Sequence, residues 1–224
     1  VCAPMVHWPE VMVAYESSEK VLFAADAFGK FGAISKYDGD WACEARRYYF
    51  NICGKYGVQV QSLLKKAAAL DIKTIAPLHG PVLKENLGYY LDLYNTWSSY
   101  GVESEGVLVA FASIHGNTRK AAEKIASILE KQGAKKVVVS DLSRDDEAEV
   151  IEDAFRYGRM IIAAPTYDGG LFPPMESFLS HLKSKNYQKR TVGIIENGTW
   201  APMSGKLMKA ALESMKEIKI CDTM

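Results

Sequence analysis

Apolar and polar residues follow a regular order in the second half of the chain that predicts alternating strands and helices. Short apolar runs of strand length are separated by stretches in which apolar residues recur every three or four positions, as on one face of a helix. The segment 118–132 has this helical spacing, and Gly133 follows it as a stop signal. The expected strands are 107–112, 136–140, 160–164 and 191–196, and the expected helices are 118–132, 146–157, 173–183 and 205–216.

The alternation predicts an α/β fold with a parallel sheet covered by helices on both faces. The first half of the chain has a less regular α/β pattern. It contains apolar runs at 11–15, 21–25 and 74–78, a helical stretch from about 41 to 70 and an aromatic amphipathic stretch at 86–100. The polar segment 101–106 begins and ends with glycine, so we expect a domain over 1–100, a linker over 101–106 and a second domain over 107–224.

Composition narrows the kind of partner to small molecules or proteins. The 27 basic residues balance the 27 acidic residues, which disfavours binding to nucleic acid or to an anionic membrane. The apolar runs are too short to span a membrane. Four cysteines, Cys2, Cys43, Cys53 and Cys221, lack zinc-site spacing, and no secretory signal precedes them, so we expect a cytoplasmic protein.

Three loops that follow expected strands carry candidate binding chemistry. The loop 113–118 leads directly into a helix, where N–H groups and hydroxyls suit a phosphate dianion. The loops 165–170 and 197–202 hold aromatic residues that suit stacking on a flat heterocycle, and glycines that let the backbone approach its edge. Each loop also has an ordinary explanation as a cap or turn. Because such loops meet at one edge of a parallel sheet, we favour a shared ligand. The candidate residues are Ser113, His115, Gly116, Asn117, Thr118, Pro165, Thr166, Tyr167, Asp168, Gly169, Gly170, Asn197, Gly198, Thr199 and Trp200.

From about Gly106 onward the chain resembles a flavodoxin, whose three FMN-contacting loops match 113–118, 165–170 and 197–200. This resemblance implies FMN as the cofactor and a flavodoxin-like doubly wound parallel sheet. His115 departs from the family pattern, because many flavodoxins carry a hydroxyl residue there. The resemblance also implies a last helix, which this sequence lacks.

The first part resembles the metallo-β-lactamase-like αββα domain of flavodiiron proteins through three short segments around His7, Asp26 and His79. Imidazole and carboxylate ligands suit iron, and a carboxylate has two oxygens with which to bridge a metal pair. By resemblance, His7 binds one of two irons, His79 binds the other and Asp26 bridges them. Singly, each residue has an ordinary explanation as a turn, cap or hydrogen-bonding residue. The remaining ligands of the family lie in an upstream H-x-E-x-D motif that is absent here, so we expect a C-terminal fragment.

Together the two resemblances imply a flavodiiron protein, which passes electrons through FMN to a diiron centre that reduces dioxygen to water, nitric oxide to nitrous oxide, or both. They also imply rubredoxin or a related reductase as electron donor, and a head-to-tail homodimer or higher oligomer. No side chain is assigned a catalytic role. Two alternatives stay open: a flavodoxin-type electron carrier with a structural first domain, and a metal hydrolase with a flavodoxin tail. The identity of the bound metal distinguishes the hydrolase from the diiron oxidoreductase, because such hydrolases use zinc and zinc does not cycle electrons.

Overall fold

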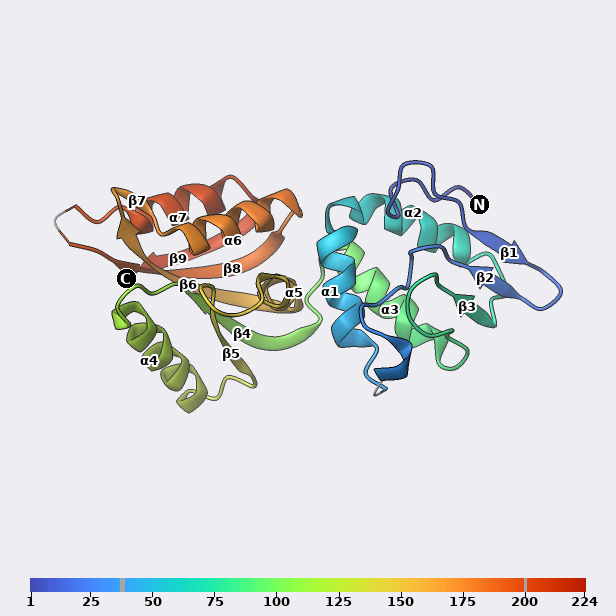
Figure 1. The fold of residues 1–224 in the computed structure, drawn as a ribbon, viewed down its shortest axis with the longest axis horizontal. Helices are drawn as coiled ribbons and strands as arrows, with labels where there is room; N and C mark the ends of the chain where they lie inside the picture. Colours follow the sequence, from blue (N-terminus) through green and yellow to red (C-terminus); the bar gives the residue numbers. More distant parts are fainter. Residues whose placement is uncertain (37–38, 200) are drawn as a thin grey trace. The chain divides into compact units, whose positions relative to one another are not determined.

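The chain folds into two compact units, Val1–Gly101 and Val102–Met224, in a computed structural model that describes residues 1–36, 39–199 and 201–224 (Figure 1). The division falls at the start of the expected linker. Much of that segment is strand, because β4 spans Ser104–Phe111 rather than 107–112. Ser104 pairs with Tyr157 of the neighbouring strand, and a bulge before Val107 accommodates the polar residues between them.

The second unit is built on a parallel sheet with the strand order β5-β4-β6-β8-β9. After β4, the strands are β5 Val137–Asp141, β6 Tyr157–Tyr167, β8 Gln188–Asn197 and β9 Lys216–Thr223, with the short β7 Gly170–Leu171 antiparallel to β6. The helices are α4 Asn117–Lys131, α5 Glu147–Arg156, α6 Pro173–Ser184 and α7 Ser204–Glu213. The chain moves outward from β4 to β5 and then returns to β6 on the other side, which makes β4 and β6 the switch point of a doubly wound sheet.

Helices cover both faces of this sheet, as the alternating pattern predicts. Figure 1 shows α4 on one face and α6 and α7 on the other. Under α4, alternate residues of β4 point the same way, and the helix meets them with small side chains that allow close packing. This core consists of Val107, Val109, Phe111, Ala122, Ala126 and Ala163.

Several expected boundaries in this unit are wrong as well. The last helix ends at Glu213 instead of 216, because Lys216 already pairs with Gln188 of β8 as the first residue of β9. Strand β6 extends well beyond 160–164, since Pro165 still pairs in register with Asn197 of β8.

In its described residues, the first unit combines a small sheet with three α-helices. Strands β1 Ala14–Glu16, β2 Val21–Phe23 and β3 Thr74–Ala76 lie in that order, with β1 antiparallel and β3 parallel to β2. The helices are α1 Ala42–Ile52, α2 Gly57–Ala67 and α3 Leu87–Ser98, with short 3₁₀ turns at Ile34–Lys36 and Gly54–Tyr56. A cluster of aromatic rings forms the core between the helices, including Tyr49, Tyr94 and Trp97.

The helix expected over 41–70 is interrupted, and tertiary packing explains the break. Gly57 begins α2 so close to α3 that a Cβ there would lie 2.3 Å from the carbonyl oxygen of Ser98. The Tyr100 hydroxyl donates a hydrogen bond to the Gly54 carbonyl, which fixes the turn between α1 and α2. In the described parts of the chain, no helix is long and apolar enough to cross a membrane.

Candidate functional site

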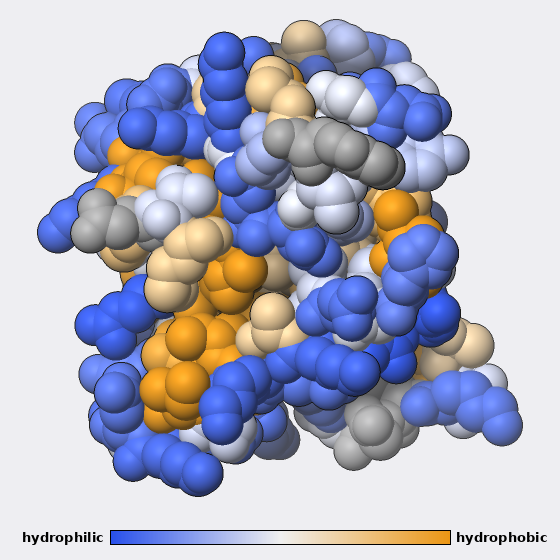
Figure 2. All heavy atoms as spheres, turned by 90° about the vertical axis from the view of Figure 1, so that its left-hand side faces the viewer, coloured by the Kyte–Doolittle hydropathy of each residue, from blue (hydrophilic) through white to orange (hydrophobic). Residues whose placement is uncertain are grey.

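The three predicted loops of the second unit begin at neighbouring points on one edge of the sheet. In the strand register, Phe111 of β4 lies opposite Ala163 of β6, and Pro165 of β6 lies opposite Asn197 of β8. All three strands run in the same direction, so their carboxyl ends meet here. Figure 2 looks onto this side of the molecule, where apolar side chains gather in patches among polar ones. The arrangement is the one that ligands use at the switch point of doubly wound sheets.

The first loop forms a cradle at the start of α4. Gly116 has a φ of +84°, which places the backbone in the left-handed region and turns the chain into the helix at Asn117. Its N–H donates a 3.0 Å hydrogen bond to the Ser113 hydroxyl, which closes the loop on itself. The first N–H groups of a helix have no partner within it and carry the positive end of its dipole. A cavity of about 380 Å³ adjoins the loop, so the geometry suits an anion such as a phosphate.

A hydrogen bond ties the first loop to the third. The Asn197 side-chain amide donates to the hydroxyl of the buried Thr118 at 3.1 Å. His115 and Asn117 are exposed on the rim of the first loop. In the third loop Gly198 and Thr199 are exposed as well, whereas Trp200 lies outside the described residues. The contact between Thr118 and Asn197 holds two of the three candidate loops together without any ligand.

The second loop is a tight hairpin. Asp168 and Gly169 both have positive φ, 48° and 72°, as two-residue hairpin turns require, and they join β6 to β7. The Tyr167 ring just before the turn is 44% exposed and leans on Phe172, with their ring centroids 5.6 Å apart. An aromatic face is therefore accessible at this edge for stacking.

The Thr166 side chain connects the second loop to the third loop and to the start of α7. Its hydroxyl oxygen accepts hydrogen bonds from the N–H groups of Met203 and Ser204 at 2.8 and 3.1 Å. A Cβ on Gly198 would lie 2.9 Å from that same oxygen. Thr166 thus braces the third loop and the start of α7, and the glycine is needed where the two loops approach closely.

Sequence reasoning missed two arginines at this edge. Arg119 and Arg144 line the 380 Å³ cavity together with residues of the first loop. Each donates to the same Asp141 oxygen, at 2.5 and 2.6 Å. Burial alone would raise the pKa of the Asp141 carboxyl, but hydrogen bonds from the Ser143 N–H and the two guanidiniums outweigh it, so its pKa lies below the ordinary value. Arg144 follows β5, so its approach to the first loop depends on the pairing of β5 with β4, which the sequence alone does not show.

The three candidate metal ligands of the first unit lie together. His7 Nε2 is 3.5 Å from Asp26 Oδ2, and His79 Nε2 is 3.3 Å from Asp26 Oδ1. Backbone hydrogen bonds between Ala24 and Ala76 and between Ala25 and Leu78 hold the two strand ends side by side. Each oxygen of the nearly buried Asp26 carboxylate therefore lies beside a different imidazole.

A cavity of about 550 Å³ opens beside these ligands and is lined by His7, His79 and Tyr48, among other residues. Burial raises the pKa of the Tyr48 phenol, so it stays a neutral hydrogen-bond donor. Within the described residues, no three His, Cys, Asp or Glu side chains converge on a single point that a metal ion would occupy. In the parts of the chain that the structure describes, His7, Asp26 and His79 are thus neighbours that do not form a group able to hold one metal ion.

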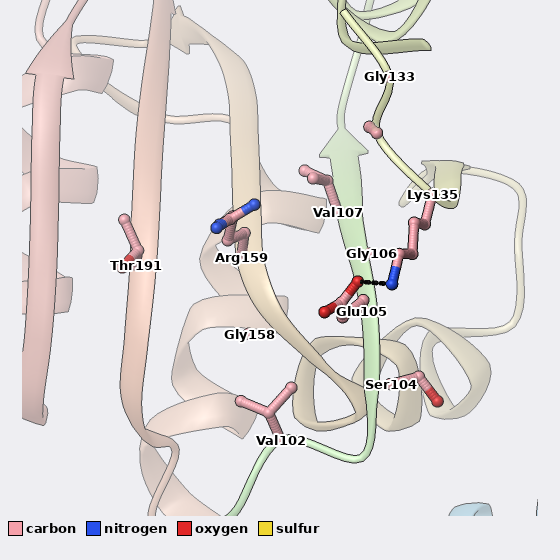
Figure 3. Close-up of a pocket in the computed structure, with 11 residues that line it drawn as sticks. Val102, Ser104, Glu105, Gly106, Val107, Gly133, Lys135, Gly158, Arg159 and Thr191 are labelled. Carbon is pink, nitrogen blue, oxygen red and sulfur yellow. Dashed lines mark ion pairs between the residues drawn. The ribbon is translucent and has the colours of Figure 1, made fainter.

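Another cavity of the second unit lies away from all of these groups. It has a volume of about 420 Å³ and is lined by the amino-terminal parts of β4, β6 and β8. Figure 3 shows its lining, in which Glu105 and Lys135 form an ion pair and Arg159 projects from β6. None of the candidate residues contributes to it.

Comparison with known proteins finds relatives that match the chain across both of its units. The family described as flavodoxin domain matches residues 108–221. An uncharacterised protein of Methanocaldococcus jannaschii is 31% identical over 184 residues, covering 80% of this chain and 46% of the relative. The anaerobic nitric oxide reductase flavorubredoxin of Vibrio vulnificus is 25% identical over 207 residues, covering 88% of this chain and 42% of that protein.

Solved structures agree on the fold. The flavodiiron protein from Giardia intestinalis matches with a TM-score of 0.90 and 21% identity, over 100% of this chain and 58% of that one. The likeness extends through both units, so the expected combination of a lactamase-like part and a flavodoxin-like part is confirmed as a fold. The chain spans less than half the length of the curated relatives given above.

Proposed function

Because the chain belongs to the flavodoxin domain family and is homologous to flavodiiron proteins, we propose that it is an FMN-dependent oxidoreductase whose first unit supplies ligands to a diiron centre. The observation that carries the proposal is the convergence of three loops on the carboxyl edge of β4, β6 and β8. The hydrogen bond between Asn197 and Thr118 supports it, since it joins two of these loops in advance of binding.

FMN, when bound, supplies a carrier that accepts electrons singly or in pairs. The loop Ser113 to Thr118 would hold the phosphate with helix N–H groups and hydroxyls. The exposed Tyr167 ring would stack on the flavin, and the glycines at 169, 170 and 198 would let backbone groups reach its edge. The remaining candidate residues of the three loops stay predictions.

In the first unit, His7 and His79 would each bind one iron and Asp26 would bridge them. One Asp26 oxygen lies near the His7 imidazole and the other near the His79 imidazole, which supports this assignment. By the same proposal the oxidant is dioxygen or nitric oxide, the electron donor is a rubredoxin or related reductase, and two chains associate head to tail. The free cysteines of the chain fit the reducing environment of a cytoplasm.

Flavin binding is tested by titrating FMN into the chain and following the quenching of flavin fluorescence. We expect one FMN per chain, and about tenfold weaker binding for Tyr167→Ala because a stacking partner is lost. Tyr89→Ala is the matched control, since Tyr89 is 43% exposed and lies in the other unit. Unquenched fluorescence with the unaltered chain would remove the basis of the proposal.

A flavodoxin-type electron carrier is the second candidate, and one observation favours it. The described residues hold no group of three or more His, Cys, Asp or Glu side chains that could bind a metal ion, whereas a stable iron site needs several ligands. Iron analysis of the protein made from its complete reading frame separates the two functions. Two irons per chain, lost in Asp26→Ala while FMN is retained, would support the diiron oxidoreductase. FMN without iron would support the carrier, and zinc in place of iron would support a hydrolase.

A further inference from the structure

We propose that Arg119 and Arg144 determine cofactor specificity by selecting a flavin that carries a phosphate over one that does not. The inference rests on the proposed FMN function and adds two binding residues outside the three loops. The ligand group concerned is a phosphate monoester dianion. Neither arginine belongs to a loop that sequence reasoning singled out.

The two side chains come from different elements and reach the same cavity. Arg119 lies in the first turn of α4, and Arg144 lies in the segment between β5 and α5. Both line the cavity of about 380 Å³, whose other walls are residues 113–116 of the phosphate loop. The cavity therefore joins two guanidinium groups to the helix N–H groups that favour an anion.

Asp141 holds both guanidiniums in place. Its Oδ2 accepts from Arg119 at 2.5 Å and from Arg144 at 2.6 Å, and the Asp141 side chain is only 9% exposed. The Arg119 guanidinium also lies 5.7 Å from the centre of the buried Phe111 ring. Two rotamer-rich side chains are thus ordered before any ligand arrives, which lowers the entropic cost of binding.

The arginines have hydrogen-bonding capacity to spare. A guanidinium has five N–H donors, and across the described residues Asp141 is the hydrogen-bond acceptor for each of these two. Both arginines line the cavity, and the described residues that line it include these two arginines and no carboxylate. Asp145, a carboxylate of the same segment, accepts a hydrogen bond from the Asp141 N–H. A dianion entering the cavity would receive charge-assisted hydrogen bonds that a neutral ribityl hydroxyl would not.

The test compares FMN with riboflavin, which lacks the phosphate, by fluorescence titration of the whole chain. The variants are Arg119→Gln and Arg144→Gln, with Arg159→Gln as the control. Arg159 is an exposed arginine of the same unit at the amino-terminal edge of the sheet (Figure 3), so the control changes net charge equally. Arg119→Lys and Arg144→Lys keep the charge but lose the fork of donors.

We expect each Gln variant to lower the preference for FMN over riboflavin by about tenfold, with riboflavin affinity unchanged, and the Arg159→Gln control to keep the full preference. The Lys variants should retain part of it, and added salt should weaken FMN binding more in the unaltered chain than in the Gln variants. Unchanged riboflavin affinity shows that a variant is folded. If the unaltered chain binds FMN but the preference survives both Gln substitutions, this inference is overturned and the proposed function stands. If it binds neither flavin, both fall.

Discussion

Replacing Gly116 by alanine separates the backbone geometry of the phosphate loop from its packing. A Cβ on Gly116 would meet nothing within 4 Å, so the substitution introduces no clash. The φ of +84° is left-handed, which costs an L-residue about 1–2 kcal/mol. Alanine also lowers the entropy of the unfolded chain, which returns about 0.4–1 kcal/mol. We therefore expect a net loss of about 1 kcal/mol in the free energy of unfolding, caused by the backbone alone.

Gly133 offers a matched control at the other end of the same helix. Its φ is +86°, and a Cβ there also meets nothing within 4 Å. Gly116→Ala and Gly133→Ala should therefore lower the urea midpoint by about the same amount, roughly 0.5 M. FMN affinity should fall about tenfold in Gly116→Ala alone, because relaxation of the strained loop misaligns the N–H donors. Equal FMN affinity of the two variants would refute the idea that Gly116 shapes a phosphate site.

Three further predictions concern stability and reactivity. The folded-state pKa of Asp141 lies below the ordinary 3.8, so its carboxylate stabilises the fold above that pH and less as pH falls through the folded value. Asp141→Asn should thus be less stable than the unaltered chain in urea at pH 7, with a gap that narrows below about pH 4; a constant gap would contradict this. Burial raises the pKa of Cys53 to about 12, so iodoacetamide at pH 8 should label Cys2 and Cys221 and spare Cys53 until the chain unfolds, as peptide mass spectrometry would show. Equal labelling of Cys53 would contradict its burial. Arg190 is buried and donates to the carbonyls of Phe155 and Tyr157, so Arg190→Ala should cost about 3 kcal/mol in thermal unfolding, and a loss well under about 1 kcal/mol would contradict that role.

The sequence predicted the second unit well because its local signals agree with its tertiary structure. Apolar periodicity in α4 and the stop at Gly133 placed that helix within one residue at each end. The start of β4 was missed, since Ser104 and Glu105 are polar and the register of pairing shifts between Ser104 and Val107. The break at Gly57 was missed as well, because it depends on α3 packing nearby rather than on local sequence.

The candidate sites depended on knowledge beyond periodicity. His7, Asp26 and His79 are far apart in the chain, and no spacing rule brings them together. Resemblance suggested the set, and the neighbouring ends of β2 and β3 bring Asp26 and His79 close. The three loops followed from the rule that parallel strands share a carboxyl edge. Arg144 escaped because its approach to the phosphate loop depends on the order of strands in the sheet, which a linear pattern does not contain.

The most direct test of FMN binding at this edge is a map of amide chemical shifts on adding FMN to the ¹⁵N-labelled chain. We expect the shifts to concentrate in residues 113–118, 166–170 and 197–199, at the carboxyl edge of β4, β6 and β8. Amides around Arg159 and Thr191, at the other edge, should stay unchanged. Shifts gathered at that opposite edge, or no shifts at saturating FMN, would contradict the account.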